Sequence, residues 1–293
     1  MTIREIVTQV RRELKEAGIE DYECESWMLL DWLLHIDRAE YYSNLEKEVE
    51  ARDRELLFSV VEKRRKHIPL QYLMKECEFM GLSFFVDERV LIPRQDTECL
   101  VELAMEEIKK RQGVCRVLDL CTGSGCIGLS LAKLCPGISV TLSDVSEGAL
   151  AVAAKNSEKL QVRPCLVRSD LFDNIPGTFH YIVSNPPYIP SRIVEGLMPE
   201  VREYEPRLAL DGGEDGLNFY RKIIRRAGEH LEDGGRLFFE IGAKQGEDLR
   251  RLMEEHGYIN VQVKRDLAGL DRIVTGTFQK CRMEKEEKIC LIN

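Results

Sequence analysis

The stretch Val117–Gly128 reads VLDLCTGSGCIG and predicts the fold of the larger part of the chain. Its first four residues have the largely apolar character of a buried strand, and the three glycines that follow have GxGxxG spacing. This spacing permits a sharp turn, a close approach of backbone to a ligand and tight packing of a helix on the strand. The stretch therefore predicts a strand, a ligand-binding glycine loop and a helix.

Strands and helices alternate on both sides of this loop. The predicted strands cover residues 116–120, 138–143, 163–167, 181–184, 236–241, 258–264 and 272–278. Alternation of this kind predicts an α/β domain with a Rossmann-like, mostly parallel sheet and helices on both faces. Residues 265–271 are too few for a crossover helix, so the last strand should be antiparallel.

The rest of the chain divides into regions of different character. Residues 1–75 show helical periodicity and predict a small all-helical domain that begins with a capping box at Thr2 and Glu5. Residues 76–92 change to period two around Met80-Gly81, which predicts a β-hairpin linker. The α/β domain should then occupy residues 93–280, and residues 281–293 read as a charged tail.

Composition excludes several classes of protein. The 293 residues carry 42 Lys and Arg against 51 Asp and Glu, a net charge of −9, which disfavours a protein that holds duplex DNA by neutralising phosphates. The ten cysteines lack CxxC or zinc-site spacing, and the N-terminus lacks an apolar signal segment. We therefore expect reduced thiols, no metal site and a cytoplasmic location. No run approaches the roughly 18 apolar residues of a membrane span, and Cys290–Asn293 fits a prenylation box only formally.

Two acidic residues extend the ligand prediction from the loop to adenosine. Asp144 follows the second strand and lies 19 residues after Gly125 (144 − 125), where a carboxylate can accept hydrogen bonds from both ribose hydroxyls. Asp170 follows the third strand and could bind the adenine amino group, with Leu171 or Phe172 covering the ring. These residues are specific for adenosine, so they leave a dinucleotide and S-adenosylmethionine both open.

The tetrad Asn185-Pro186-Pro187-Tyr188 favours S-adenosylmethionine over a dinucleotide as the ligand. It follows the fourth strand, and ligands of such sheets bind beyond the carboxyl ends of the strands. Two prolines make the corner stiff and remove two N–H donors, so carbonyls and the Asn185 side chain remain as acceptors for a planar NH2 group. Tyr188 could lie against the flat face of the substrate. Such a grip aims an amide or aryl-amine nitrogen at the methyl carbon of a sulfonium, which S-adenosylmethionine supplies and a nicotinamide does not.

With these motifs the chain resembles the protein-(glutamine-N5) methyltransferases of the HemK/PrmC family over about residues 1–280. Besides the glycine loop and the tetrad, the resemblance rests on residues 91–98, 204–206, 209–213, 215–217 and 240–242. It implies a transfer of methyl from S-adenosylmethionine to the glutamine of the Gly-Gly-Gln motif of peptide-chain release factors, in support of translation termination. It also implies that the helical domain is a substrate clamp.

The resemblance assigns roles by matching position. The cofactor should contact Cys121, Thr122, Gly123, Ser124, Gly125, Asp144, Asp170, Leu171 and Asn185. The glutamine amide should bind at Asn185, Pro186, Pro187 and Tyr188, of which Asn185, Pro186 and Tyr188 are the catalytic candidates. Arg94 and Glu98 are expected to help close the cofactor pocket, with the alternative that Glu98 is an acid in the first turn of a helix. Two positions depart from the family pattern, Gln95 where Pro is usual and Cys121 where Gly is frequent.

Other functions use parts of the same pattern. An amino methyltransferase of nucleic acid would need a base-reading element. The insertion Ser191–Leu210 is short, with four acids against three arginines, and the basic helical patch Arg221, Lys222, Arg225 and Arg226 is interpreted as a solvated face. We therefore expect no stable binding of nucleic acid. A methyltransferase of a ribosomal-protein glutamine stays open. A nicotinamide oxidoreductase leaves the tetrad unexplained, and the intact Asn185, Asp144 and glycine loop disfavour a binding module without turnover.

Overall fold

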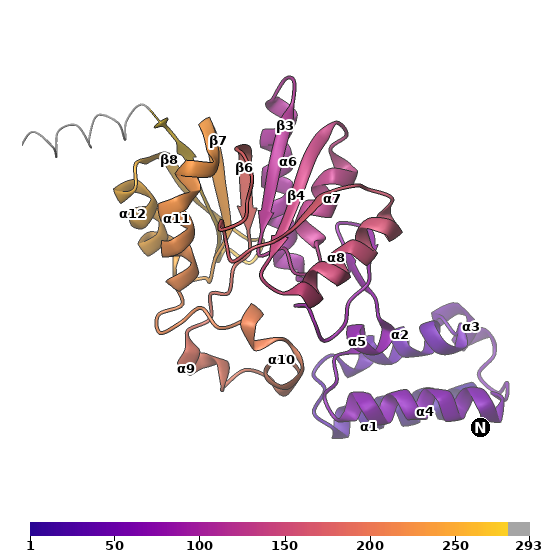
Figure 1. Cartoon of the computed structure of the whole chain (residues 1–293). Helices are drawn as coiled ribbons and strands as arrows, with labels where there is room; N and C mark the ends of the chain where they lie inside the picture. Colours follow the sequence, from indigo (N-terminus) through magenta and orange to yellow (C-terminus); the bar gives the residue numbers. More distant parts are fainter. Residues whose placement is uncertain (281–293) are drawn as a thin grey trace, which may run out of the picture. The chain divides into compact units, whose positions relative to one another are not determined.

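The computed structural model describes residues 1–280, which form two compact units (Figure 1). The first unit contains Met1–Lys75 together with Met198–Tyr204. The second contains Glu76–Leu197 and the chain from Glu205 onward. The expected charged tail and the prenylation-like end lie outside the described residues.

The first unit, called the helical unit below, consists of helices and has an apolar core of its own. They are α1 (Ile3–Glu16), α2 (Tyr22–Leu34), α3 (Arg38–Ser43), α4 (Ala51–Arg65), α5 (Leu70–Met74) and α10 (Pro199–Tyr204). The predicted capping box is present, because the Thr2 hydroxyl accepts from the Glu5 amide and the Glu5 carboxylate accepts from the Thr2 amide. The inner face of α4 is formed by Leu57, Val60 and Val61, and the neighbouring Leu56 is exposed.

A short hairpin opens the second unit, called the α/β unit below. Its strands are β1 (Cys77–Phe79) and β2 (Leu82–Phe84), paired antiparallel around Met80 and Gly81. Both turn residues have positive φ, +54° and +68°. A two-residue turn of this type matches the twist of the flanking strands. The hairpin therefore forms where the sequence predicts it.

The main sheet has seven strands within the described residues. They are β3 (Cys115–Leu120), β4 (Ile138–Asp144), β5 (Cys165–Arg168), β6 (Phe179–Ser184), β7 (Leu231–Glu240), β8 (Tyr258–Arg265) and β9 (Asp271–Phe278). Their order is β5-β4-β3-β6-β7-β9-β8, with β5 to β7 parallel and β9 antiparallel to both of its neighbours. This confirms the predicted Rossmann-like sheet with an antiparallel last strand.

Three strands begin two or more residues away from the prediction. Strand β6 begins at Phe179 instead of 181. Strand β5 begins at Cys165 instead of 163. Strand β7 begins at Leu231 instead of 236, because Leu231 pairs with Phe179 ahead of a register shift. Residues 232–235 read EDGG, and none of them has a Cα partner in the neighbouring strands, so they form the irregularity between the Leu231 and Arg236 pairs.

Helices cover both faces of the sheet (Figure 1). One face carries α6 (Glu98–Lys110), α7 (Cys126–Leu134) and α8 (Glu147–Leu160), and the other carries α11 (Asn218–His230) and α12 (Gly246–Glu255). Neighbouring strand residues alternate between the two cores, as Val117 and Leu118 do. Burial on both faces explains why these strands read as continuous apolar runs.

Several short elements gather near the carboxyl ends of the strands. They are the 3-10 turns η1 (Gln95–Thr97) and η2 (Arg207–Ala209) and the helix α9 (Ser191–Val194). Strand β3 lies between β4 and β6: the chain runs from β3 outward to β4 and β5, and then crosses to β6 on the other side of β3. The crevice beyond such a switch point is the usual ligand site of an open α/β sheet.

Candidate active site

The glycine loop joins β3 to α7 with the geometry that its spacing predicts. Gly123 and Gly125 have φ of +55° and +82°, values that residues with a Cβ rarely adopt. Gly128 serves a different purpose, because an added Cβ would lie 2.3 Å from Leu142 Cδ2 and 2.9 Å from Asp119 Oδ2. The third glycine therefore lets α7 lie directly on the sheet.

Asp119 supports the loop from below. Its Oδ2 accepts hydrogen bonds from the Thr122 hydroxyl at 2.6 Å and from the Gly128 amide at 2.9 Å. Burial raises the pKa of Asp119 to about 7, although both donors act in the opposite direction. The sequence places Asp119 in a strand but does not predict this role, since an acid inside an apolar run does not reveal its partners.

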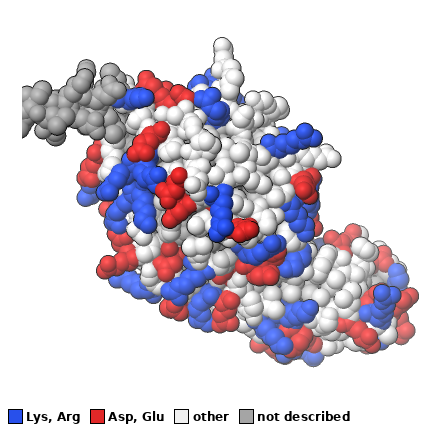
Figure 2. Space-filling view, viewed as in Figure 1, with Lys and Arg blue, Asp and Glu red and all other residues white. Residues whose placement is uncertain are grey.

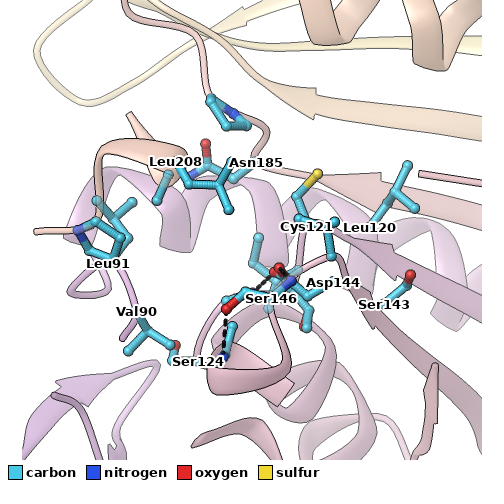
Figure 3. Close-up of a pocket in the computed structure, with 18 of the residues that line it drawn as sticks. Val90, Leu91, Leu120, Cys121, Ser124, Ser143, Asp144, Ser146, Asn185 and Leu208 are labelled. Atoms are coloured by element: carbon cyan, nitrogen blue, oxygen red, sulfur yellow. Dashed lines mark hydrogen bonds between the residues drawn. The ribbon is translucent and has the colours of Figure 1, made fainter. Parts of the chain in front are cut away.

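Asp144 is tied to the loop and still has capacity for a ligand. Its Oδ2 accepts from the Gly123 amide and its Oδ1 from the Ser146 amide, both at 2.9 Å (Figure 3). A carboxylate has about four lone-pair sites, so each oxygen can accept one more hydrogen bond. Burial raises the pKa of Asp144, and the amides oppose this shift. The arrangement suits two neighbouring hydroxyls of a ribose.

Cys121, where the family frequently has Gly, adopts a backbone conformation that is typical of glycine. Its φ is +61°, in the left-handed region where glycine is the default residue. Burial raises the pKa of the Cys121 thiol strongly, so it stays protonated at neutral pH. The side chain packs against the core on the α11 face of the sheet. Cys121 is thus a packing residue in a strained position.

One pocket joins the glycine loop to the Asn-Pro-Pro-Tyr corner. Among the expected residues, it is lined by Cys121, Thr122, Gly123, Ser124, Asp144, Asp170, Leu171, Asn185 and Pro187. Gly125, Pro186 and Tyr188 are expected site residues that do not belong to the lining of this pocket. Figure 3 shows Asn185 and Leu208 on one side of the pocket and Asp144 with Ser146 across from them. The fold thus brings together residues from four separate strand ends.

Part of the pocket wall is formed by residues that the sequence motifs did not predict. Arg89, Val90, Leu208, Ala209 and Phe219 also line the pocket. They come from the segment after the hairpin, from η2 and from α11, which are far apart in the sequence. The motif at 209–213 was the available signal for the η2 side, because it shares Ala209 with the pocket.

The Asn-Pro-Pro-Tyr corner has a different side-chain arrangement from the one expected. Asn185 is half-buried, and its Nδ2 donates to the Thr97 hydroxyl at 3.4 Å. Tyr188 turns its hydroxyl to the Glu240 carboxylate at 3.3 Å, and its ring packs partly in the core. Tyr188 therefore braces the corner from behind in this structure.

A glycine-rich loop holds the backbone of the corner in place. An added Cβ at Gly212 would lie 2.7 Å from Tyr188 Cα and 2.8 Å from the Pro187 carbonyl oxygen. The Gly212 amide donates to the Ile189 carbonyl at 2.8 Å, and Gln245 Nε2 donates to the Tyr188 carbonyl at 3.1 Å. This loop accounts for the glycines in the 209–217 region.

Glu240 is a buried acid in the family motif at residues 240–242, and the sequence did not predict a role for it. It ends β7, and its side chain receives the Tyr188 hydroxyl. Burial raises the pKa of Glu240 to about 7, against the effect of Thr97, Arg272 and Tyr188. An acid at the end of an apolar strand beside the switch point was the signal that could have identified it.

Arg94 and Glu98 were both expected at the pocket, and only one lies there. Arg94 lines the pocket and donates to the buried carboxylate of Glu205 at 2.5 Å. The expectation for Glu98 is wrong, because its carboxylate accepts from the Met80 amide at 2.5 Å. The turn of the hairpin leaves that amide free, and Glu98 at the start of α6 satisfies it.

Residues 1–280 contain neither a cluster of metal ligands nor a helix that could span a membrane. This part of the chain has no group of three or more His, Cys, Asp and Glu side chains that could hold a metal ion. Its helices are too short or too polar to cross a membrane.

Known proteins match the chain in sequence over almost its whole length. The PrmC N-terminal domain profile matches residues 5–74, and the methyltransferase small domain profile matches residues 96–196. The release factor glutamine methyltransferase of Geobacter sulfurreducens is 42% identical over 94% of this chain and 96% of its own length. The protein of the same name from Clostridium acetobutylicum is 38% identical over 94% of this chain and 98% of its own length.

The chain belongs to the release factor glutamine methyltransferase family. This confirms the resemblance that the sequence motifs indicated. The fold of this family member also occurs in more distant solved structures. A methyltransferase from Pyrococcus furiosus superposes with a TM-score of 0.51 at 18% identity, over 74% of this chain and 98% of that one. A Thermus thermophilus 16S rRNA methyltransferase in complex with AdoMet and guanosine superposes with a TM-score of 0.51 at 18% identity, over 70% of this chain and 50% of that one.

Proposed function

We propose that the chain transfers the methyl group of S-adenosylmethionine to the side-chain amide nitrogen (N5) of the glutamine in the Gly-Gly-Gln motif of release factors. The observation that carries this proposal is the stiff corner at Asn185–Tyr188, which shares a pocket with the glycine loop. The names of the relatives support the substrate, because the matched proteins are release factor glutamine methyltransferases. Release factors act on cytoplasmic ribosomes, so we assign the chain to the cytoplasm.

The residues of the pocket fit the methyl donor. Asp144 can take the ribose hydroxyls with the lone pairs that the loop amides leave free. Asp170 and Leu171 line the same pocket and supply a hydrogen-bond acceptor and an apolar face for adenine. S-adenosylmethionine supplies a methyl group on a positively charged sulfur, which keeps the S–C bonding electrons when the methyl is transferred to nitrogen.

The corner positions the nitrogen that accepts the methyl group. An amide nitrogen is a poor nucleophile, because its lone pair is delocalised into the carbonyl group. Asn185 Oδ1 and the Pro186 carbonyl can each accept one of its hydrogens and so fix its direction. After transfer the nitrogen is positively charged and releases a proton without a strong base. Positioning and oriented dipoles are therefore the main contribution of this chain to the rate.

The charges of the chain favour a protein substrate over a nucleic acid. Two members of the basic patch on α11 are paired, Arg221 with Asp215 and Arg226 with Asp173 at 2.6 Å. Figure 2 shows acidic and basic side chains intermixed over the face in view. Nucleic-acid binding relies on a concentrated positive surface. We propose that the partner is the release factor and that nucleic acid is not stably bound.

The test is the substitution Asn185→Ala. It removes an acceptor aimed at the reacting nitrogen, so the rate of release-factor methylation should fall by about two to three orders of magnitude. Quantitative mass spectrometry of the Gly-Gly-Gln peptide measures that rate, and calorimetry measures S-adenosylmethionine binding. The matched control is Asn174→Ala, whose side chain is exposed and bonds only the Arg168 carbonyl. A normal rate for Asn185→Ala would refute the proposed role of the corner.

A further inference from the structure

The direction of the Asn185 amide matters for the reaction, and this inference rests on the proposed function. The two ends of a side-chain amide have nearly the same shape, but the oxygen accepts hydrogen bonds and the nitrogen donates them. Only an amide with Oδ1 toward the pocket can hold the NH2 group of a glutamine. Asn185 Nδ2 lies 3.4 Å from Thr97 Oγ1. A hydroxyl can donate or accept, so Thr97 alone does not fix this direction.

Glu240 can decide which role the Thr97 hydroxyl takes. The Thr97 side chain is 2% exposed and close enough to Glu240 to lower the pKa of that carboxyl. Glu240 Oε1 is used by the Tyr188 hydroxyl. Glu240 Oε2 is buried and has no hydrogen-bond partner within residues 1–280. A buried acceptor without a donor is costly, and an ionised carboxylate cannot donate.

We propose that Glu240 and Thr97 are positioning residues that set the direction of the Asn185 amide. In this arrangement the Thr97 hydroxyl turns to the ionised Glu240 carboxylate and donates to Oε2, the buried oxygen that has no other hydrogen-bond partner within residues 1–280. The Thr97 oxygen can then only accept, and it accepts from Asn185 Nδ2. Asn185 Oδ1 is thereby left for the substrate. The order of donors runs from Asn185 to Thr97 to Glu240, and it is fixed by the negative charge at its end.

The surroundings of Glu240 determine when that charge is present. Arg272 on β9 lowers the pKa of Glu240, and Asp96, which pairs with Arg272 at 2.9 Å, raises it. Asp266 is the second partner of Arg272. The other titratable side chains that act on the same site are Tyr188, Tyr220 and Cys126. Burial raises the pKa of all three, so they stay neutral in the physiological range.

Glu240 therefore changes charge close to neutral pH. Its pKa is raised to about 7, with burial as the largest cause. Below this pH the protonated carboxyl can donate to Thr97, and Thr97 can donate to Asn185 Oδ1. The NH2 group of Asn185 then faces the pocket and opposes the NH2 group of the substrate. The methylation rate should accordingly rise with pH until Glu240 is ionised.

Three substitutions test the order of donors by single-turnover methylation at saturating S-adenosylmethionine and release factor. Thr97→Val keeps the shape and removes the hydroxyl, so the rate should fall about tenfold or more while cofactor affinity stays within about twofold. Thr97→Ser keeps the hydroxyl and should restore most of the rate. Glu240→Gln should give a low rate without the rise between about pH 6 and 8 that the unaltered chain shows.

Asp119 provides the control for pH, because burial raises its pKa to about 7 as well. Asp119→Asn should keep the rise in rate at saturating cofactor, since Asp119 contacts the glycine loop and not the corner. A rise that survives in Glu240→Gln and is lost in Asp119→Asn would overturn the proposal. A Thr97→Val rate equal to that of the unaltered chain would also overturn it.

A measurement without turnover separates this proposal from the proposed function. The NMR signal of the Asn185 side-chain amide, identified by its loss in Asn185→Ala, should shift with a midpoint near about pH 7. The shift should persist in Asp119→Asn and vanish in Glu240→Gln. This result supports the order of donors whichever substrate is methylated. An Asn185 signal that does not change over this range, or that changes equally in Glu240→Gln, would contradict it.

Discussion

At the scale of single residues, two buried carboxyl groups lie beneath the site, one under each half. Asp119 supports the glycine loop and Glu240 supports the Asn-Pro-Pro-Tyr corner. Burial raises the pKa of each to about 7. A carboxyl with a raised pKa in the folded state favours folding while it is protonated. That contribution is complete below its ordinary pKa and is lost as the pH rises through about 7.

The substitution Glu240→Gln should reveal this dependence on pH. Glutamine stays neutral, so the variant gains stability relative to the unaltered chain between about pH 4.5 and 8, by up to about 3 kcal/mol. Urea denaturation at both pH values measures the free energy of unfolding. Any loss of packing is common to both measurements and cancels. The exposed Glu214→Gln is the matched control, for which the change should stay below about 0.5 kcal/mol. Equal changes in the two variants would contradict the account.

The sequence predicts residues of this site only where a local pattern encodes them. Gly123, Gly128 and Asp144 follow from the spacing of one strand–loop–helix–strand unit, and the structure places them as that spacing requires. Thr97 and Glu240 do not, because they lie on a 3-10 turn and at the end of β7, and only the folded sheet brings them to Asn185. The role of Glu98 was mistaken because its partner, the Met80 amide, is set by the hairpin.

At the scale of elements, the function depends on how loops hold one another. The corner after β6 is bracketed by the loop at residues 210–216 and by Gln245 before α12. Gln245 contacts the backbone of Tyr188, and the loop contacts the backbone of Ile189 directly after the corner. Backbone cannot move aside as a side chain would. The stiffness that two prolines give locally is therefore completed by residues distant in sequence. The residues of the family motifs at 209–217 form one side of this bracket.

Gly212→Ala tests the bracket. The new Cβ would lie within 2.8 Å of the backbone at both Pro187 and Tyr188, so the corner must shift. A displacement of about 1 Å at a reacting group can lower the rate by about 100-fold, and we expect a loss of about 10- to 100-fold in release-factor methylation. Cofactor affinity should change much less. Gly196→Ala is the control, because its Cβ would meet only the Ile193 carbonyl at 3.5 Å. Equal rates in the two variants would show that the bracket is not needed.

At the scale of the whole molecule, the chain passes between its two units more than once. Residues 198–204 belong to the helical unit, although the sequence on either side belongs to the α/β unit. Arg64, which is 2% exposed, secures them by bonding Glu25 at 2.6 Å and Glu200 at 2.5 Å. The domain limits proposed from the sequence could not include this return, because six residues of helix carry no signal of the core they join.

Arg64→Ala should release this segment from the helical unit. It leaves two partly buried carboxylates without their cation, and breaking a buried pair costs about 3–5 kcal/mol. Hydrogen exchange at residues 198–204 should become faster, while β3 and α7 keep their protection. Arg65→Ala removes a neighbouring arginine whose side chain is 41% exposed, and it should cost at most about 1 kcal/mol. Unchanged exchange in Arg64→Ala would show that other contacts hold the segment.

The most direct test of the central claim is the site at which the chain places a methyl group. A purified release factor is incubated with the chain and S-adenosylmethionine, beside ribosomal RNA and DNA as competing acceptors, and each product is analysed by mass spectrometry. The account predicts one added methyl on the side-chain nitrogen of the Gly-Gly-Gln glutamine and none on the nucleic acids. Methylated nucleic acid with an unmodified release factor would contradict it.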